Sequence, residues 1–276
     1  MCGPFWTGAT AGAGWRWAAA LSIAACLIPL RTTIGLAADG YRGRYEAREY
    51  ADADGAKLLY RLLKPQDYDP QVKYPLVLFL HGAGERGNDN VRQLVHGMNE
   101  FASDEIMAEY PCFVIAPQCP AEQKWVEVDW SATGHEMPSA AAAPLRLTMA
   151  AIAALEKEFS IDPARIYVTG LSMGGYGTWD AIARYPQRFA AAAPICGGGD
   201  PAQARKFATL PVWAFHGGKD GVVRPQRSRE MIEAIKAAGG SPKYTEYPDA
   251  GHNSWTATYQ NPEFFAWLFA QRRAGE

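Results

Sequence analysis

The amino-acid sequence predicts an α/β protein with a mostly parallel central sheet, helices on both faces of that sheet and an antiparallel hairpin at its N-terminal side. From residue 43 onward, short apolar segments of β type alternate with longer amphipathic segments, as in successive βα units. The chain has 276 residues, of which 48% are hydrophobic, enough for one large buried core. No repeat or low-complexity linker divides residues 39–276, so we expect them to form a single domain.

The predicted strands begin with the hairpin, in which residues 44–50 and 57–63 are joined by a turn that ends at Gly55. The other strands are short and mostly apolar, and they are bounded by turn-forming residues. They are expected at residues 75–80, 112–116, 166–169, 189–194, 212–215 and 243–247.

The predicted helices lie between these strands. Apolar residues recur at helical spacing over residues 144–159, and Pro163 follows that segment as a stop. Further helices are expected at residues 173–184, 227–238 and 262–272. The longest irregular stretch is residues 118–142. A loop of this length in a compact domain is usually functional, so we expect it to be a lid or part of a site.

The first 38 residues have the pattern of a signal peptide. Arg16 precedes the apolar residues 17–30, and small residues follow up to Ala38, with cleavage expected after Ala37 or Ala38. This predicts a secreted or periplasmic protein with no stable membrane insertion after cleavage. A lipoprotein anchored through Cys26 is a less favoured alternative, because apolar residues would then begin the mature chain. An uncleaved N-terminal anchor is another alternative. No later apolar run reaches the roughly 18 residues of a membrane span.

The charge and the cysteine content of the chain bear on nucleic-acid binding and on disulfide formation. The formal net charge is -2 and the basic residues are scattered, so no nucleic-acid-binding face is expected. Of the five cysteines, Cys112, Cys119 and Cys196 lie beyond the predicted signal peptide. A disulfide between Cys119 and Cys196 and three buried free thiols are equally compatible with the sequence.

A short motif points to nucleophilic catalysis. Residues 170–174 match the pattern G-x-S-x-G, with Ser172 at its centre. The pattern is weak by itself in a chain with 27 glycines. Here it follows a predicted strand and opens a predicted helix, which is the setting that exposes a serine hydroxyl above a sheet. We therefore predict that Ser172 is the nucleophile.

A serine nucleophile needs a base and an acid to orient that base. His252 follows the last predicted strand, which is the expected place of the base, and Asp220 ends the loop after the preceding strand, which is the expected place of the acid. Asp249 is more consistent with a turn cap, and Asp200 is a less favoured alternative acid. We expect His216 to be buried and hydrogen-bonded, supporting the Asp220 loop.

Two backbone amides should stabilise the oxyanion of the tetrahedral intermediate. One is expected from Met173, at the positive end of the helix that follows Ser172. The other is expected from the glycine-rich loop after residue 80, from Ala83 or, as second choice, Gly84. His81 is expected to brace this loop. No metal-binding spacing or phosphate-binding loop is present in the sequence, so neither metal nor cofactor is expected.

With these motifs the chain resembles bacterial esterases of the α/β-hydrolase fold, in particular the polyhydroxybutyrate depolymerase and feruloyl esterase-like group, also described as predicted peptidases. The resemblance rests on residues 81–87, 166–179, 216–220 and 251–255, and it assigns the triad roles to Ser172, Asp220 and His252. Dienelactone hydrolases are similar in fold but carry cysteine where this chain has Ser172. Prolyl oligopeptidases share the catalytic domain but add a propeller, for which the chain has no room.

The resemblance implies a secreted serine carboxylesterase acting through an acyl-enzyme on a small or polysaccharide-linked ester, with feruloyl or acetyl esters favoured. A serine peptidase of the prolyl oligopeptidase-like class and a polyhydroxyalkanoate depolymerase are the alternatives. An aromatic wall for the substrate is expected from Trp125, Trp130, Tyr176 and Trp255, although the same residues are equally compatible with a role in the core.

Overall fold

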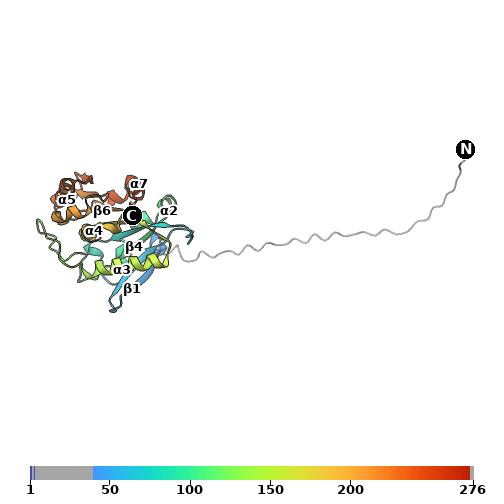
Figure 1. Cartoon of the computed structure of the whole chain (residues 1–276), viewed down its shortest axis with the longest axis horizontal. Coiled ribbons are helices and arrows are strands. Elements are labelled where there is room, and N and C mark those ends of the chain that lie inside the picture. The colour runs from blue at the N-terminus through green and yellow to red at the C-terminus, as the bar shows by residue number, and fades with distance from the viewer. Residues whose placement is uncertain (2, 4–39, 274–276) are drawn as a thin grey trace. The chain divides into compact units, whose positions relative to one another are not determined.

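The strands of the described chain form one mixed sheet in the order β1-β2-β4-β3-β5-β6-β7-β8 (Figure 1). The structure is a computed structural model that describes residues 1, 3 and 40–273. The strand bounds are β1 Tyr45–Ala51, β2 Lys57–Leu63, β3 Tyr74–Leu80, β4 Phe113–Pro117, β5 Ile161–Leu171, β6 Ala191–Ile195, β7 Trp213–Gly217 and β8 Lys243–Tyr247. The predicted hairpin is β1–β2, and it joins β4 in antiparallel register, whereas β3 to β8 run parallel.

The strand order changes direction at β3. The chain passes from β3 to β4 on one side and then crosses back to β5 on the other side of β3. Loops that leave neighbouring strands in opposite directions create a crevice at the carboxyl ends of those strands, the usual ligand site of open α/β sheets. Here the crevice is formed by the loop that begins at His81 and by the turn at Ser172.

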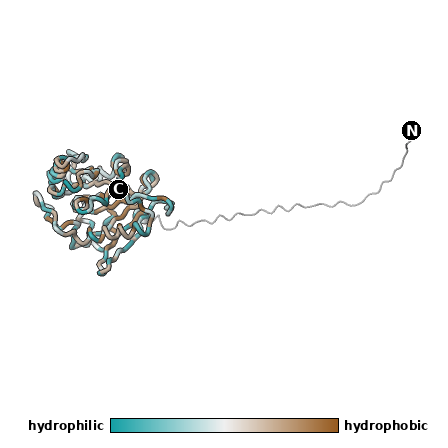
Figure 2. Tube along the Cα trace, in the orientation of Figure 1, coloured by the Kyte–Doolittle hydropathy of each residue, from teal (hydrophilic) through white to brown (hydrophobic). Residues whose placement is uncertain are grey.

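Helices cover both faces of the sheet, as the sequence predicts. Strand β3 is buried along its whole length, and its alternate side chains enter two separate cores, Leu76 and Leu78 in one, Val77 and Phe79 in the other. The first core also holds α3 Ala143–Glu158, α4 Met173–Arg184 and α5 Gln226–Ala237. The second core holds α1 Met98–Phe101, α2 Asp104–Glu109, α6 Trp255–Tyr259 and α7 Pro262–Ala270. Figure 2 shows the apolar positions gathered along the central strands.

Most predicted elements lie within two residues of those in the structure, and the differences have local causes. Strand β5 begins at Ile161 instead of residue 166, because Ile161 already pairs with Tyr74 before an irregularity in the ladder. In that irregular segment Asp162 Oδ1 accepts the amide of Ala164 at 3.0 Å. Helices α1, α2 and α6 were not predicted, because they have only four to six residues and so lack a repeated amphipathic pattern.

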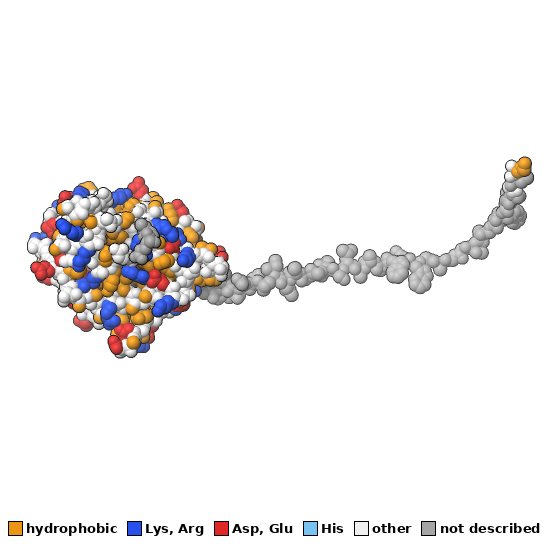
Figure 3. Space-filling view, viewed as in Figure 1, with side chains coloured by type: hydrophobic (Ala, Val, Ile, Leu, Met, Phe, Trp, Pro, Cys, Tyr) orange, Lys and Arg blue, Asp and Glu red, His pale blue; other side chains and the backbone are white. Residues whose placement is uncertain are grey.

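The predicted signal peptide, including Cys26, lies outside the described residues. Within the described chain, Cys112, Cys119 and Cys196 are buried free thiols, so the structure contains the unpaired alternative and not the Cys119–Cys196 disulfide. None of the described helices is long and apolar enough to cross a membrane. On the face drawn in Figure 3, acidic and basic side chains are interspersed.

Candidate active site

Ser172 occupies a strained turn between β5 and α4. Its backbone has φ 54° and ψ -116°, in the region that residues with a side chain rarely adopt. The turn is held by the Ser172 amide, which donates to the carbonyl of Ile195 at 2.9 Å. At Gly170 a Cβ would lie 2.6 Å from the carbonyl oxygen of Leu80, and at Gly174 it would overlap that same oxygen. The two glycines of the motif are therefore required by the close approach of α4 to the end of β3.

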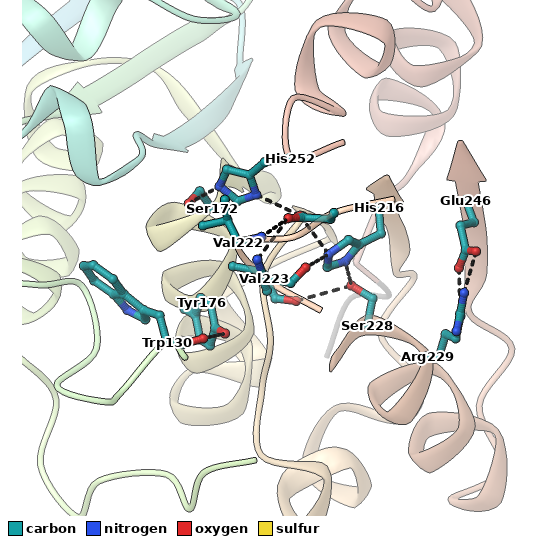
Figure 4. Close-up of polar contacts among 12 residues, drawn as sticks. Trp130, Ser172, Tyr176, His216, Val222, Val223, Ser228, Arg229, Glu246 and His252 are labelled. Atoms are coloured by element: carbon teal, nitrogen blue, oxygen red, sulfur yellow. Dashed lines mark hydrogen bonds and ion pairs between the residues drawn. The ribbon is translucent and has the colours of Figure 1, made fainter. Parts of the chain in front are cut away.

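Ser172, His252 and Asp220 form one hydrogen-bonded chain (Figure 4). His252 Nε2 lies 2.9 Å from Ser172 Oγ, and His252 Nδ1 lies 2.8 Å from Asp220 Oδ2. Because a carboxylate only accepts, Nδ1 carries the proton, which leaves Nε2 free to accept from the serine hydroxyl. The Asp220 side chain is fully buried, whereas that of His252 is 21% exposed. The structure thus joins residues that are 32 and 80 positions apart in the chain.

Every acceptor position of Asp220 is occupied. Oδ1 accepts the amides of Val222 at 2.8 Å and Val223 at 3.0 Å. Oδ2 lies 2.8 Å from His252 Nδ1 and 3.3 Å from His216 Nε2. Burial by itself would raise the pKa of Asp220, but the hydrogen bonds from the two imidazoles and the two amides outweigh it and hold the pKa well below its ordinary value. Asp220 is therefore ionised throughout the neutral range.

The other residues weighed for the triad have different surroundings. Asp249 is exposed and accepts from Lys219 Nζ at 2.7 Å. Asp200 caps the short helix Pro201–Phe207 through the amide of Ala202 and also accepts the amide of Met137, so it faces the 118–142 loop. Neither reaches His252.

His81 braces the loop after β3, as expected. Its Nε2 accepts the amide of Cys119 at 2.9 Å, and its Nδ1 lies 2.6 Å from the carbonyl of Gly82. Burial lowers the pKa of His81 to about 4, so this imidazole is neutral.

The amides expected to bind an oxyanion lie on either side of Ser172. Ala83 and Gly84 belong to the short helical turn Ala83–Glu85, and both line the pocket that contains Ser172. Met173 begins α4, which has 12 residues and therefore places a partial positive charge at this amide. Within the described chain, none of these three amides donates a hydrogen bond to another protein group. They are free to bind a ligand oxygen.

The pocket beside Ser172 has a volume of about 330 Å³. Its wall includes two of the predicted aromatic residues, Trp130 and Trp255, together with Val222 and Val223. A larger hollow of about 430 Å³ lies at the start of β3, near the stacked rings of Tyr110 and Phe269, and no triad residue lines it. The pocket at Ser172 is therefore the one that can serve this chemistry.

The structure does not place the other two predicted aromatic residues on the pocket wall. Trp125 is fully buried, and its indole N–H donates to the carbonyl of His81 at 3.0 Å. Tyr176 is 1% exposed and lies behind Trp130, where its hydroxyl donates to the Trp130 carbonyl at 3.2 Å. These two rings support the wall from the core side. Sequence position near a catalytic residue does not reveal the direction in which a side chain points.

Several residues of the pocket were not singled out from the sequence, Val223 among them. Glu85, His96 and Val222 all line it, and His96 Nε2 lies 3.6 Å from Glu85 Oε1. Glu85 lies inside the predicted oxyanion loop, which is a signal that could have been used. His96 and Val222 carry no comparable signal, because only the folding of their loops brings them to Ser172.

One group of side chains in the described chain has metal-binding atoms close together, namely Cys196, Asp220 and His252. Asp220 and His252 already use these atoms for each other. Burial raises the pKa of the Cys196 thiol to about 12, which opposes the thiolate that a metal requires. We assign no metal to this group.

Comparison with known proteins places the chain in a family. A family model matches residues 124–263, about half of the chain. The chain belongs to the dienelactone hydrolase family. The matched segment contains Ser172, Asp220 and His252.

This dienelactone hydrolase family member is also similar to solved esterases. A thermostable esterase is 42% identical with a TM-score of 0.77, covering 84% of this chain and 64% of the esterase. A ferulic acid esterase from Anaeromyces mucronatus is 15% identical with a TM-score of 0.58, covering 82% of this chain and 90% of that chain, a likeness of fold. These likenesses confirm the predicted α/β-hydrolase fold.

A curated relative from Arthroderma benhamiae is described as an uncharacterized secreted protein. It is 26% identical over 252 residues, which cover 76% of this chain and 25% of the relative. The chain thus spans about a quarter of that protein's length.

Proposed function

We propose that the protein is a serine hydrolase that cleaves carboxylic esters through an acyl-enzyme, with Ser172 as nucleophile, His252 as base and Asp220 as the acid that orients the base. The observation that carries this proposal is the continuous hydrogen-bonded chain from Ser172 Oγ through His252 to Asp220 Oδ2. A serine hydroxyl is a weak nucleophile without such a base. Membership of a hydrolase family and similarity to a thermostable esterase support the same reaction.

In the proposed reaction His252 Nε2 takes the proton of Ser172 while Oγ forms a bond to the ester carbonyl carbon. The carbonyl electron pair moves onto oxygen, and the amides of Met173 and Ala83, or Gly84, stabilise that charge. The intermediate then collapses, the bond to the alcohol oxygen breaks, and His252 returns the proton to the leaving alcohol. Water repeats these steps on the acyl-enzyme and releases the acid.

For the substrate we propose a feruloyl or acetyl ester, free or linked to polysaccharide. Trp130 and Trp255 border the pocket and would pack against a phenolic ring or a sugar. The fold neighbour from Anaeromyces mucronatus is named a ferulic acid esterase. We also propose that the protein is secreted, on the strength of its N-terminal sequence pattern and of the secreted relative from Arthroderma benhamiae.

The test compares the purified protein with Ser172→Ala on nitrophenyl, feruloyl, acetyl-sugar and hydroxybutyrate esters and on peptide amides. We expect Ser172→Ala to lose at least about a thousandfold in kcat and to lose labelling by a fluorophosphonate. Ser131→Ala is the matched control, because Ser131 is exposed and its hydroxyl bonds only to Asp129. Ester turnover that survives in Ser172→Ala would refute the assignment, and faster cleavage of amides than of esters would favour a peptidase.

A further inference from the structure

A second imidazole shares the carboxylate oxygen that holds the proposed base. His216 Nε2 lies 3.3 Å from Asp220 Oδ2, the same atom that lies 2.8 Å from His252 Nδ1. The side chains of His216 and Asp220 are both fully buried. Figure 4 shows the rings of His216 and His252 apart from each other and joined through dashed lines to one carboxylate.

The partners of His216 settle where its proton lies. Nε2 is also 2.9 Å from the carbonyl of Val223, and a carbonyl, like a carboxylate, can only accept. Nε2 must therefore carry a hydrogen, which is shared between Val223 and Asp220. On the other side of the ring, Nδ1 lies 2.7 Å from the hydroxyl of Ser228, which in turn is 3.3 Å from the carbonyl of Gly197. When the His216 ring is neutral, its Nδ1 accepts a hydrogen bond from the Ser228 hydroxyl, and when the ring is charged, Nδ1 donates to that hydroxyl. In both states Nε2 carries a hydrogen and donates to Asp220.

We propose that His216 is a positioning residue that limits how strongly Asp220 stabilises a proton on His252, and so extends the active range of the enzyme to lower pH. The proposal rests on the proposed function, because it assumes that neutral His252 is the base. An N–H donor on Oδ2 withdraws negative charge from the atom that His252 contacts. With less negative charge at Oδ2, the charged form of His252 is less favoured, and the base stays unprotonated in more acidic solution.

Other charged groups near His216 do not replace this effect. Glu246 lies opposite His216 on β8, but its carboxylate is paired with Arg229 of α5 through two contacts of 2.8 and 2.6 Å. Figure 4 shows this pair set apart from the hydrogen bonds around His216 and His252. Hydrogen bonds from Arg229 and Tyr244 hold the pKa of Glu246 at about 2, so the pair remains ionised as pH falls.

The neighbouring loop and strand add no net charge either. Lys219 and Asp249 form an exposed ion pair beside Asp220. Cys196, at the end of β6, carries a buried thiol that stays neutral because burial raises its pKa to about 12. Two side chains therefore contact Oδ2 of Asp220 in the described chain, those of His252 and His216.

The experiment compares His216→Leu with His216→Gln in the full chain. Leu removes the N–H at similar volume, whereas the amide nitrogen of Gln can again donate to Asp220 and Val223. The double variant His216→Leu/Ser228→Ala is included because it also removes the hydroxyl that loses its contact with the His216 ring in His216→Leu, which gives a second protein without the donor. Circular dichroism checks the fold of each variant.

Two measurements are made on each protein. The first is the acid limb of the pH profile of kcat/KM on the best ester. The second is the pH titration of the His252 ring resonance in protein labelled at histidine, which is practical with five histidines in the chain and does not depend on turnover. We expect the midpoint of the acid limb and the midpoint of the His252 titration to move to higher pH in the Leu variants, by roughly half a pH unit to one pH unit. In His216→Gln both midpoints should return to their wild-type positions.

An unchanged His252 titration in both Leu variants would overturn the proposal, and so would a shift in His216→Gln as large as that in His216→Leu. A failure of the ester assignment has a different signature, because Ser172→Ala would then retain turnover while the ring titration still reports the effect of His216 on His252.

Discussion

The indole of Trp255 meets the imidazole of His252 edge to face, with ring centroids 5.4 Å apart and planes at 88°. On another side, Trp255 packs against His96 with centroids 5.3 Å apart. Trp255 therefore both holds the proposed base and borders the substrate pocket.

Replacing Trp255 should test both roles. We expect Trp255→Ala to lower kcat/KM about tenfold, because an aromatic pair contributes up to roughly 1.5 kcal/mol beyond its buried area. Trp255→Phe keeps a ring beside His252 and should recover most of that loss. Steady-state kinetics on the best ester decide the matter, and an Ala variant with full kcat/KM would show that the pair does not matter.

The Tyr176 hydroxyl should affect substrate binding while the protein still folds. It donates to the carbonyl of Trp130 at 3.2 Å and so ties the pocket wall to α4. Tyr176→Phe keeps the buried ring and removes one hydrogen bond, worth about 1 kcal/mol. We expect KM to rise about fivefold and the free energy of unfolding to fall by no more than about 1 kcal/mol. Tyr185→Phe, on the same side of the molecule but with no side-chain hydrogen bond in the described chain, is the control. Equal effects of the two changes would contradict the role of the Trp130 contact.

Gly174→Ala should prevent correct folding of the elbow. An added methyl group would overlap the carbonyl oxygen of Leu80, and its nearest neighbours are all backbone atoms of Leu80 and His81, which cannot rotate away as a side chain can. The expected cost exceeds about 4 kcal/mol, measured by denaturant unfolding or seen as loss of soluble protein. Gly221→Ala is the control, because a Cβ there meets nothing within 4 Å. A soluble Gly174→Ala protein of wild-type stability would disprove the packing argument.

Asp220 should make the stability of the fold depend on pH. Its pKa in the folded chain lies well below the value of about 3.9 in an unfolded chain. Its contribution is therefore complete above about pH 4 to 5 and is lost as pH falls toward the folded-state pKa. Denaturant unfolding between pH 7 and pH 3 should show a steeper loss of stability for the wild type than for Asp220→Asn. Parallel curves would mean that Asp220 has no such depressed pKa.

Asp220→Asn should also reduce kcat, by about three to four orders of magnitude on the best ester, because an amide at this position favours the wrong tautomer of His252. Asp249→Asn is the matched control, since Asp249 is exposed and pairs only with Lys219. Initial-rate assays on the best ester measure kcat for both variants. A comparable loss in Asp249→Asn would indicate that the acid had been assigned to the wrong residue.

Much of the architecture follows from local features of the sequence. Alternation of apolar β-type and amphipathic segments predicts the parallel sheet, and its strands lie within two residues of the predicted positions except at the start of β5. The short helices α1, α2 and α6 were missed because a helix of one or two turns has no periodicity to detect. Their positions depend on contacts with the second core.

The sequence by itself determined the α/β fold and singled out Ser172, Asp220 and His252, because the elbow needs glycines at two positions and the chain order of the motifs follows the strand order. Only the tertiary structure decided that Trp130 and Trp255 face the pocket while Trp125 and Tyr176 face the core. It also brought His216 to the same oxygen of Asp220 as His252. The physical reason is that the steric needs of a turn and the periodicity of a helix or strand depend on neighbouring residues in the sequence. The direction of a side chain depends instead on packing between segments far apart in the chain.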